Sequence, residues 1–343
     1  MNSSEEAAAA ATLTRLGLSR IRDHQREAVR GYWKGEDVFL CAKTGSGKSL
    51  VFEMAPFLFD FIESKHYRGI VTSMVPVVSP LVALVRRQTK ILCSRGINAA
   101  YLGDSLMNVS ESNDKFSMDD IRNGHVNIVF GSQESFVCEQ RDLLKELDTK
   151  MKAIFVDEAQ CVVKYGRRAK KNTPAFREAY GRISELRSVY GNRVPIVALT
   201  ATASKDMVHK IKKDLGILQC LSVIGDPNKE NIRYHVKVVN GGLESDFEWL
   251  VNLFEILETS FRDQGMGMDV KVVKHVVHYG PADDVDSYLQ ETGWAGRDPV
   301  SHCEAVSLEY KHSLNGRHIS KSMKDYCEAN VCRRVQLQLQ LLL

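Results

Sequence analysis

The sequence predicts an α/β protein with a parallel sheet covered by helices, and its 343 residues leave room for a second domain. Three observations lead to this prediction. Short apolar runs alternate with helical patterns, a glycine-containing loop follows the first run, and acidic or hydroxyl residues follow two later runs. The carboxyl ends of parallel strands are the usual place for a ligand site.

Six apolar runs are the predicted strands. They are apolar at nearly every position, which is typical of strands buried on both faces. The runs are VFLC (38–41), IVTSMVPVV (70–78), INAAYL (97–102), VNIVF (126–130), AIFV (153–156) and VPIVAL (194–199).

A phosphate-binding loop is predicted directly after the first strand, where AKTGSGKS (42–49) leads into a helical pattern. Glycines let backbone N–H groups and the helix N-terminus face phosphates, and a Lys-Ser pair suits the β- and γ-phosphates and Mg²⁺. The alternative is an ordinary glycine-rich turn. The candidate ATP contacts are Thr44, Gly45, Ser46, Gly47, Lys48 and Ser49, with Ser49 also a Mg²⁺ ligand.

Two adjacent acids end the fifth predicted strand, in AIFVDEAQ. Unpaired carboxylates avoid such positions, so a bound metal-nucleotide would explain them. Asp157 would then hold Mg²⁺, and Glu158 would orient or deprotonate the attacking water. The alternative is a pair of acids favoured by a helix dipole.

Two further segments extend the candidate site. LTATAS (199–204) follows the sixth strand, and its hydroxyls would alternatively cap the next helix. Gln25 lies upstream of the loop, and its amide suits the edge of adenine because it donates and accepts at once. Alone, it would be a surface glutamine of a helix.

Composition leaves the class of partner open. The 343 residues are 44% hydrophobic and 26% charged, which is typical of a globular protein with room for two domains. The net charge of +3 neither supports nor excludes nucleic acid. Eight cysteines without a CxxC pair favour a reducing compartment, and we expect no signal peptide and no membrane span.

Taken in order, these segments resemble the RecQ family of superfamily 2 DNA helicases. The resemblance rests on Gln25, AKTGSGKS, SPLVALVRRQ, VDEAQCVVKYG, LTATAS, GDPNKENIRYHV, QGMGMDVKVVKHVVHYG and YLQETGWAGRD. It implies two RecA-like lobes, a P-loop NTPase that uses ATP and Mg²⁺, and 3′ to 5′ DNA unwinding in repair and recombination. It also implies single-stranded and forked DNA as partners and a nuclear location, and it identifies no protein partner.

The resemblance assigns further residues. Arg22, Gln25 and Gln290 would contact ATP, and Arg297 would contact the γ-phosphate. Trp294 stands at a family arginine position. Gln160 stands at a family histidine, where it can still hydrogen-bond toward the threonine loop or the other lobe, so we expect altered coupling and a retained ATPase.

Candidate DNA contacts come from both motifs and physical argument. Ser79 and Pro80 are predicted as the N-cap and first residue of a helix whose start would bind a DNA phosphate. The basic residues after DEAQ would alternatively form a solvated loop or a nuclear-import patch, and Arg87 would alternatively lie on a solvated helix face. The full set is Ser79, Pro80, Arg87, Gly131, Ser132, Tyr165, Arg167, Arg168, Thr200 and Thr202.

The second lobe is shorter than a RecA-like lobe requires. We predict an N-terminal segment at 1–12, a first lobe at 13–220, an incomplete second lobe at 221–316 and a remnant of the RecQ zinc-binding region at 317–343. Such a short lobe is expected to pack poorly. Zinc is not expected, because only Cys327 and Cys332 lie nearby. The alternative function is a nucleic-acid-binding ATPase or helicase fragment without unwinding activity.

Overall fold

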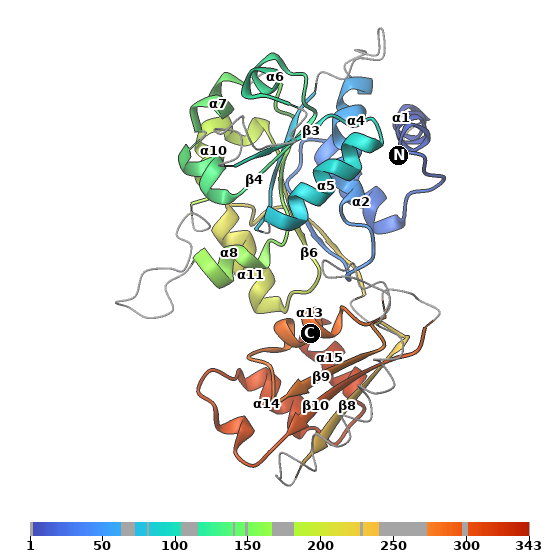
Figure 1. Cartoon of the computed structure of the whole chain (residues 1–343), viewed down its shortest axis with the longest axis vertical. Helices are drawn as coiled ribbons and strands as arrows, with labels where there is room; N and C mark the ends of the chain where they lie inside the picture. The colour runs from blue at the N-terminus through green and yellow to red at the C-terminus, as the bar shows by residue number, and fades with distance from the viewer. Residues whose placement is uncertain are drawn as a thin grey trace, which may run out of the picture. The chain divides into compact units, whose positions relative to one another are not determined.

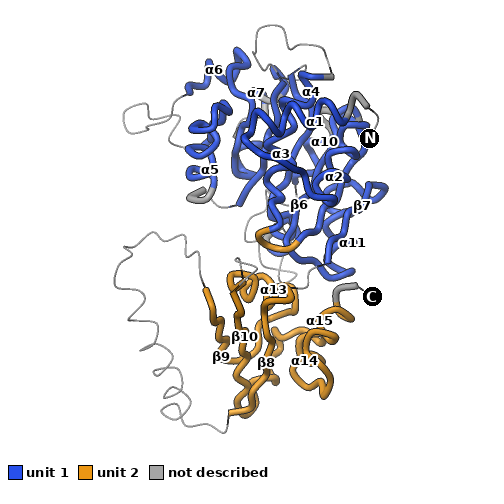
Figure 2. The backbone as a smooth tube through the Cα atoms, turned by 90° about the vertical axis from the view of Figure 1, so that its right-hand side faces the viewer, with its two compact units in different colours: residues 1–42, 46–226 blue, residues 43–45, 227–343 orange. Residues whose placement is uncertain are grey.

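The computed structural model describes residues 3–62, 73–80, 82–103, 116–139, 141–147, 150–166, 182–226, 229–239, 273–296 and 301–342. The chain forms two compact units, residues 1–42 with 46–226 and residues 43–45 with 227–343 (Figure 2). Residues 221–226, assigned above to the second lobe, therefore belong to the first unit. Among the described helices, none has the length and apolar character that a membrane span needs.

A parallel seven-stranded sheet forms the centre of the first unit, in the order β3-β4-β2-β5-β6-β1-β7. Its strands are β1 (Val38–Cys41), β2 (Val75–Val78), β3 (Ala99–Leu102), β4 (Ile128–Gly131), β5 (Ile154–Val156), β6 (Ile196–Thr200) and β7 (Leu221–Ile224). The first six are buried at every position, and each coincides with a predicted run. The predicted parallel sheet is confirmed.

Helices cover both faces of this sheet (Figure 1). One face packs against α1 (Ser3–Arg15), α2 (Asp23–Trp33), α3 (Leu50–Glu53), α4 (Ala55–Ile62) and α5 (Val82–Ser94). The other face packs against α6 (Met118–Asn123), the π-helix η2 (Ser135–Glu139), α7 (Arg141–Glu146), α8 (Gln160–Gly166), α10 (Glu185–Tyr190) and α11 (Lys205–Leu215), and η3 (Gly191–Arg193) follows α10. Two apolar cores therefore sandwich the sheet.

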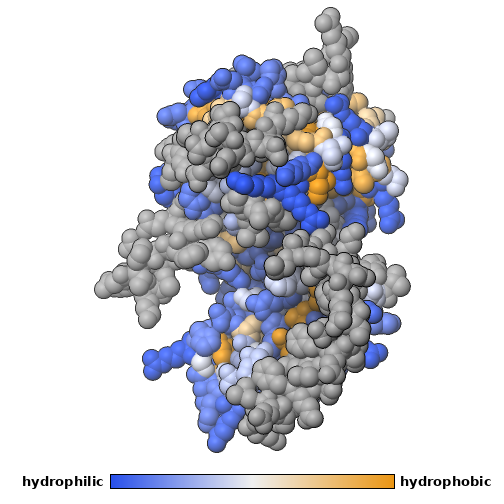
Figure 3. Space-filling model, viewed as in Figure 1, coloured by the Kyte–Doolittle hydropathy of each residue, from blue (hydrophilic) through white to orange (hydrophobic). Residues whose placement is uncertain are grey.

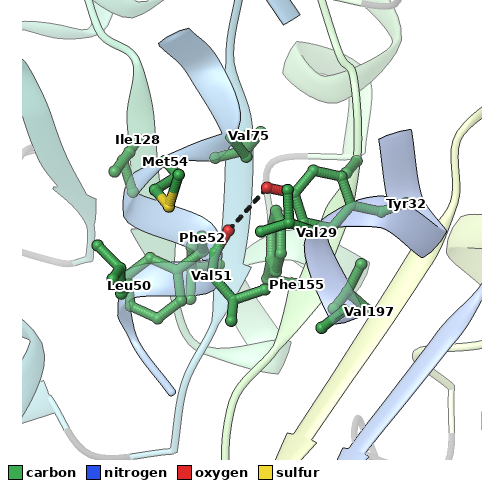
Figure 4. Close-up of a cluster of buried hydrophobic side chains, with 14 of the residues drawn as sticks. Val29, Tyr32, Leu50, Val51, Phe52, Met54, Val75, Ile128, Phe155 and Val197 are labelled. Carbon is green, nitrogen blue, oxygen red and sulfur yellow. Dashed lines mark hydrogen bonds between the residues drawn. The ribbon is translucent and has the colours of Figure 1, made fainter. Parts of the chain in front are cut away.

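Tyr32 and Phe155 lie at the centre of the first core (Figure 4). Their rings meet edge to face at 5.6 Å, and Phe155 is also 6.1 Å from the ring of Phe52. The Tyr32 hydroxyl is buried and donates to the carbonyl oxygen of Val51 at 3.1 Å. Because β5 carries Phe155, this packing fixes the strand that precedes Asp157.

The start of α5 differs from its prediction. The helix begins at Val82, so Ser79 and Pro80 precede it and are not its N-cap and first residue. Ser79 instead continues the pairing of β2 with β4, since its backbone N–H donates to the carbonyl oxygen of Gly131 at 3.0 Å. By contrast, Ser204 does cap α11, since its hydroxyl accepts from the N–H of Met207 at 3.4 Å.

The second unit contains a parallel three-stranded sheet in the order β8-β10-β9. Its elements are β8 (Ile232–Val238), β9 (His275–Tyr279), α13 (Val285–Thr292), β10 (Cys303–Glu309), the short 3₁₀ turn η4 (Ser313–Asn315), α14 (Lys321–Glu328) and α15 (Arg333–Leu342). The glycine loop at 265–269 and the segment DFEWLVNLFEILETSF lie outside the described residues.

The described part of the second unit has an apolar core, to which α14 and α15, beyond the predicted lobe at 221–316, contribute; the expectation that this lobe packs poorly or does not fold stays a prediction. Tyr288 and Tyr326 are fully buried together with Met323, and the Tyr326 hydroxyl donates to that of Tyr288 at 3.1 Å. These side chains are buried because three helices supply large residues to one cluster.

On the face drawn in Figure 3, hydrophilic residues dominate the described surface, and hydrophobic residues form small separate patches.

His275 and His278 lie within β9. Among the described residues, no group of three or more histidine, cysteine or acidic side chains is placed to hold a metal ion. Cys327 is buried and its thiol donates to the Glu309 carboxylate at 3.3 Å, whereas Cys332 is exposed.

Burial of His278 gives the second unit a predicted pH dependence. Its side chain is 9% exposed, its Nδ1 lies 3.1 Å from Glu291 Oε2, and its ring packs on Tyr288 at 4.9 Å. Burial lowers the pKa of His278 below 6.5, so the folded unit favours the neutral imidazole. This contribution to stability is complete above the unfolded pKa and is lost as the pH falls through the folded pKa.

We therefore expect the melting temperature of the second unit to fall between pH 7.5 and pH 5.5, and His278→Gln to reduce that fall. Differential scanning calorimetry of the full chain measures both. His275→Gln is the matched control, because this histidine lies on the same strand and its side chain is 29% exposed. An equal pH dependence in His278→Gln and wild type would contradict the prediction.

Candidate nucleotide site

Three polar segments meet because they follow neighbouring strands of the first unit's sheet, although residues 43–45 of the first segment are grouped with the second unit. In the sheet, β6 lies between β5 and β1. The loop 42–49 follows β1, Asp157 and Glu158 follow β5, and Thr200 ends β6. Since all three strands are parallel, these segments lie at one edge of the sheet.

The loop after β1 has the backbone of an anion site. Gly45 and Gly47 have φ values of +84° and +77°, which residues with a Cβ rarely adopt. A Cβ at Gly47 would also lie 2.8 Å from the amide nitrogen of Gln25. These two positions therefore require glycine, as the sequence analysis assumed for a loop that curls around phosphates.

Two side chains of this loop fit a phosphate ligand. The Ser46 hydroxyl is buried and has no hydrogen-bond partner among the residues that the structure describes. Lys48 Nζ donates to the carbonyl oxygen of Ala42, in its own loop, at 2.7 Å. Burial lowers the pKa of Lys48, while Glu158 and Asp157 act to raise it. A phosphate would give both groups an anionic partner.

Gln25 contacts the same loop directly. Its amide nitrogen donates to the carbonyl oxygens of Gly47 at 2.7 Å and Ser46 at 3.3 Å, and its amide oxygen accepts from the N–H of Arg22 at 2.8 Å. Gln25 therefore joins the start of α2 to the phosphate loop. The adenine contact expected of Gln25 stays a prediction, and it would compete with these bonds.

His24 is a site residue that the sequence analysis missed. A nitrogen of its ring lies 3.2 Å from the carbonyl oxygen of Ser46. Burial lowers the pKa of this histidine, the bond to Ser46 opposes that change, and Arg22 and Lys48 add to it. Its position next to Gln25 in DHQREAV was the available signal.

Asp157 and Glu158 are adjacent acids, and the charge of Glu158 shifts the pKa of Asp157. Burial and the charge of Glu158 raise the pKa of Asp157 to about 7, and Lys48 opposes this shift. A divalent cation would relieve that penalty, so the pair fits the expected Mg²⁺. Glu158 has a left-handed backbone with φ +49°, and its N–H donates to Asp157 Oδ1 at 3.0 Å.

Gln160 joins these acids to the threonine segment. Its amide nitrogen donates to Glu158 Oε2 at 2.6 Å, and its amide oxygen accepts from the Thr200 hydroxyl at 2.7 Å. The predicted bond from Gln160 toward the threonine loop is confirmed. A continuous path of side-chain bonds therefore runs from the acid after β5 to the end of β6.

Thr200 and Thr202 are buried, with 0% and 7% of their surfaces exposed. The Thr200 hydroxyl faces Gln160 and the carbonyl oxygen of Thr202. A DNA contact through the Thr200 side chain is therefore unsupported in this conformation. The geometry instead favours a structural link between the two motifs.

The other DNA candidates of the first unit occupy different settings. Ser79 and Pro80 are buried at the end of β2, Gly131 ends β4, and the Ser132 hydroxyl lies 3.1 Å from that of Ser135. Arg87 is exposed on α5. The backbone of Tyr165 belongs to α8, but its side chain is not described. Arg167 and Arg168 lie outside the described residues.

The second unit holds the remaining candidates. Gln290 is half-buried on α13, and Trp294 is 59% exposed in the turn after it. Arg297 lies outside the described residues.

Residues 22–211 match the family model described as DEAD/DEAH box helicase. This match covers more than half of the chain and spans the phosphate loop, DEAQ and LTATAS.

Curated relatives carry RecQ names. The chain is 24% identical to the ATP-dependent DNA helicase Q-like 2 of Arabidopsis thaliana, over 84% of this chain and 47% of that protein. It is 25% identical to the ATP-dependent DNA helicase RecQ of Pasteurella multocida, over 94% of this chain and 58% of that protein. The chain therefore spans about half the length of these relatives.

Solved structures share the fold. Mss116p, bound to single-stranded RNA and AMP-PNP, superposes with a TM-score of 0.63 at 15% identity, over 92% of this chain and 73% of that one. The Mycobacterium smegmatis helicase Lhr, bound to single-stranded DNA and AMP-PNP, gives 0.52 at 14% identity, over 90% of this chain and 47% of that one. These matches show the RecA-like fold of helicase lobes.

Proposed function

Because this chain belongs to the DEAD/DEAH box helicase family, we propose that it is an ATP-dependent DNA helicase of the RecQ type. The observation that carries the proposal is the path from Lys48 and the acids after β5 through Gln160 to Thr200. Such a path joins the groups that bind and hydrolyse ATP to the next strand of the sheet.

Each residue has a role in this proposal. The backbone of residues 44–48 and the Lys48 ammonium bind the phosphates, while Ser49 and Asp157 hold Mg²⁺. The bound ion would neutralise charge on the phosphate oxygens. Glu158 orients the attacking water and accepts its proton. Arg22, Gln25, Gln290 and Arg297 complete the ATP contacts that the RecQ resemblance implies.

Finer assignments follow the same resemblance. We propose 3′ to 5′ movement on single-stranded and forked DNA, a role in repair and recombination, and a nuclear location. Ser79, Arg87, Ser132 and the segment 165–168 are the proposed DNA contacts of the first unit. No zinc is assigned to Cys327 and Cys332.

A nucleic-acid-binding ATPase without unwinding activity is the second candidate. One observation favours it: the alignment with the Pasteurella multocida protein is 389 residues long, although this chain has only 343. That relative therefore contains residues with no counterpart here. Loss of such residues from a second lobe would spare ATP binding in the first.

ATP hydrolysis, with and without single-stranded DNA, and strand displacement separate the two candidates. Lys48→Ala should lower DNA-stimulated hydrolysis by about 100-fold or more, because it removes a cation that stabilises the transferred phosphoryl group. Lys34→Ala is the control, since this exposed lysine lies outside the site. Hydrolysis without strand displacement would favour the second candidate, and ATP binding without DNA-stimulated hydrolysis would exclude the motor.

A further inference from the structure

Lys229 is a buried lysine whose ammonium group contacts the turn after α13. Its surface is 6% exposed, and Nζ donates to the carbonyl oxygens of Gly293 at 2.7 Å and Ala295 at 3.0 Å. We infer that Lys229 is a positioning residue that fixes the turn at residues 293–296. The functional part of this inference rests on the proposed helicase function, since the turn directly precedes Arg297.

The two carbonyl groups lie at and just past the end of a helix: Gly293 is the C-cap of α13, and Ala295 follows two residues later. The N–H of Gly293 still bonds to Leu289 at 2.9 Å, and that of Ala295 bonds to Thr292 at 3.0 Å, so the chain stays coiled through the turn. The last carbonyls of a helix have no partner within it, and the helix dipole makes them attractive to a cation. The Lys229 ammonium supplies both a hydrogen-bond donor and a positive charge at this end of the helix.

Asn231 holds the other side of the same turn. Gly296 has φ +61°, and a Cβ there would lie 2.8 Å from Asn231 Nδ2. The same nitrogen donates to the carbonyl oxygen of Ser301 at 3.2 Å. Asn231 therefore packs against the last described residue of the turn and bonds to the residue where the described chain resumes.

Arg334 of α15 holds the segment that carries these two residues. Its guanidinium donates to the carbonyl oxygens of Lys229 at 2.9 Å, Ile232 at 2.7 Å and Glu230 at 3.3 Å. It also lies over the ring of Tyr234 at 5.8 Å. The conformation of residues 293–296 thus depends, through Lys229 and Asn231, on a side chain of the last helix.

The consequence for catalysis is a change in turnover more than in ATP affinity. The resemblance places Arg297 on the γ-phosphate, where its charge acts in the transition state. A turn that loses its two bonds to Lys229 would misplace this residue, and a small misplacement costs about 10- to 100-fold in rate. We expect Lys229→Met to lower kcat by that amount and to change the KM for ATP little.

A second readout follows the turn itself and needs no activity. The chain has three tryptophans, and Trp294 lies within the turn. In a Trp33→Phe, Trp249→Phe background, the fluorescence of Trp294 reports the turn alone. We expect Lys229→Met to lower its anisotropy and increase its quenching by acrylamide. Lys229→Arg, which keeps donors for both carbonyls, should restore most of the anisotropy and of kcat.

The control is Lys321→Met, which removes an exposed lysine from α14 in the same unit. Circular dichroism checks that each variant folds. If Lys229→Met does not fold, Arg334→Met tests the same set of contacts, because Arg334 holds the segment that carries Lys229. An unchanged Trp294 signal in both folded variants would overturn the inference. If the wild type lacks ATPase activity, the proposed function fails while the fluorescence result still decides the role of Lys229.

Discussion

Glu158→Gln is expected to lower the rate of ATP hydrolysis by about 100-fold or more, because the variant loses the group that accepts a proton from the attacking water. ATP binding should persist, since the Lys48 ammonium and the loop backbone are untouched. The local network should also persist, because a glutamine oxygen can replace Glu158 Oε2 as the acceptor for Gln160. The substitution therefore tests the role of Glu158 in hydrolysis without changing ATP binding or the local hydrogen bonds.

Single-turnover hydrolysis and titration with a fluorescent ATP analogue measure the two quantities. Glu36→Gln is the matched control, because it removes an exposed acid of the first unit outside the site. If Glu158→Gln hydrolyses ATP at the wild-type rate, Glu158 is not the base, and the proposed role of the DEAQ acids is wrong.

Phe155→Ala should have the largest effect on stability. Phe155 has 0% exposed surface and lies against Tyr32 and Phe52 in the core of Figure 4. Truncating such a side chain removes buried apolar surface and leaves a cavity, which costs about 3–5 kcal/mol. That is a large fraction of the ~5–15 kcal/mol that stabilises a typical domain.

Urea unfolding of the full chain, followed by circular dichroism, measures this loss. Tyr32→Phe is the control in the same cluster, because it removes only the hydroxyl that bonds to Val51 and should cost about 0.5–1.5 kcal/mol. Equal destabilisation by the two substitutions would show that Phe155 does not occupy a rigid packed core.

The strands of the first sheet are predictable because burial on both faces leaves a continuous apolar run. β7 was missed for the same physical reason: its outer position leaves Ser222 and Ile224 exposed, so the run is interrupted. β8 and β10 were also missed. Only Ile232 of β8 is fully buried, and the buried β10 contains the polar residues Ser307 and Glu309, which bond to each other at 2.8 Å.

The residue types of the candidate site are predictable, but their partners are not. A strand followed by AKTGSGKS or by DEAQ indicates phosphate and metal chemistry from local sequence. The bond from Gln25 to the loop depends on the packing of α2 against β1, and the bond from Gln160 to Thr200 depends on the pairing of β5 with β6. Local sequence contains neither arrangement. Lys229 lies in the segment GDPNKENIRYHV, but its buried contacts could not be predicted, because a lone lysine in a loop is usually solvated.

The left-handed backbone of Glu158 has a consequence for how this site meets its ligand. A residue with a Cβ at φ +49° costs about 1–2 kcal/mol relative to ordinary backbone. That cost is met when the chain folds, together with the side-chain entropy lost as Gln160 holds the carboxylate. The acid is thus preorganised, and less ordering remains to oppose nucleotide binding or the hydrolytic step.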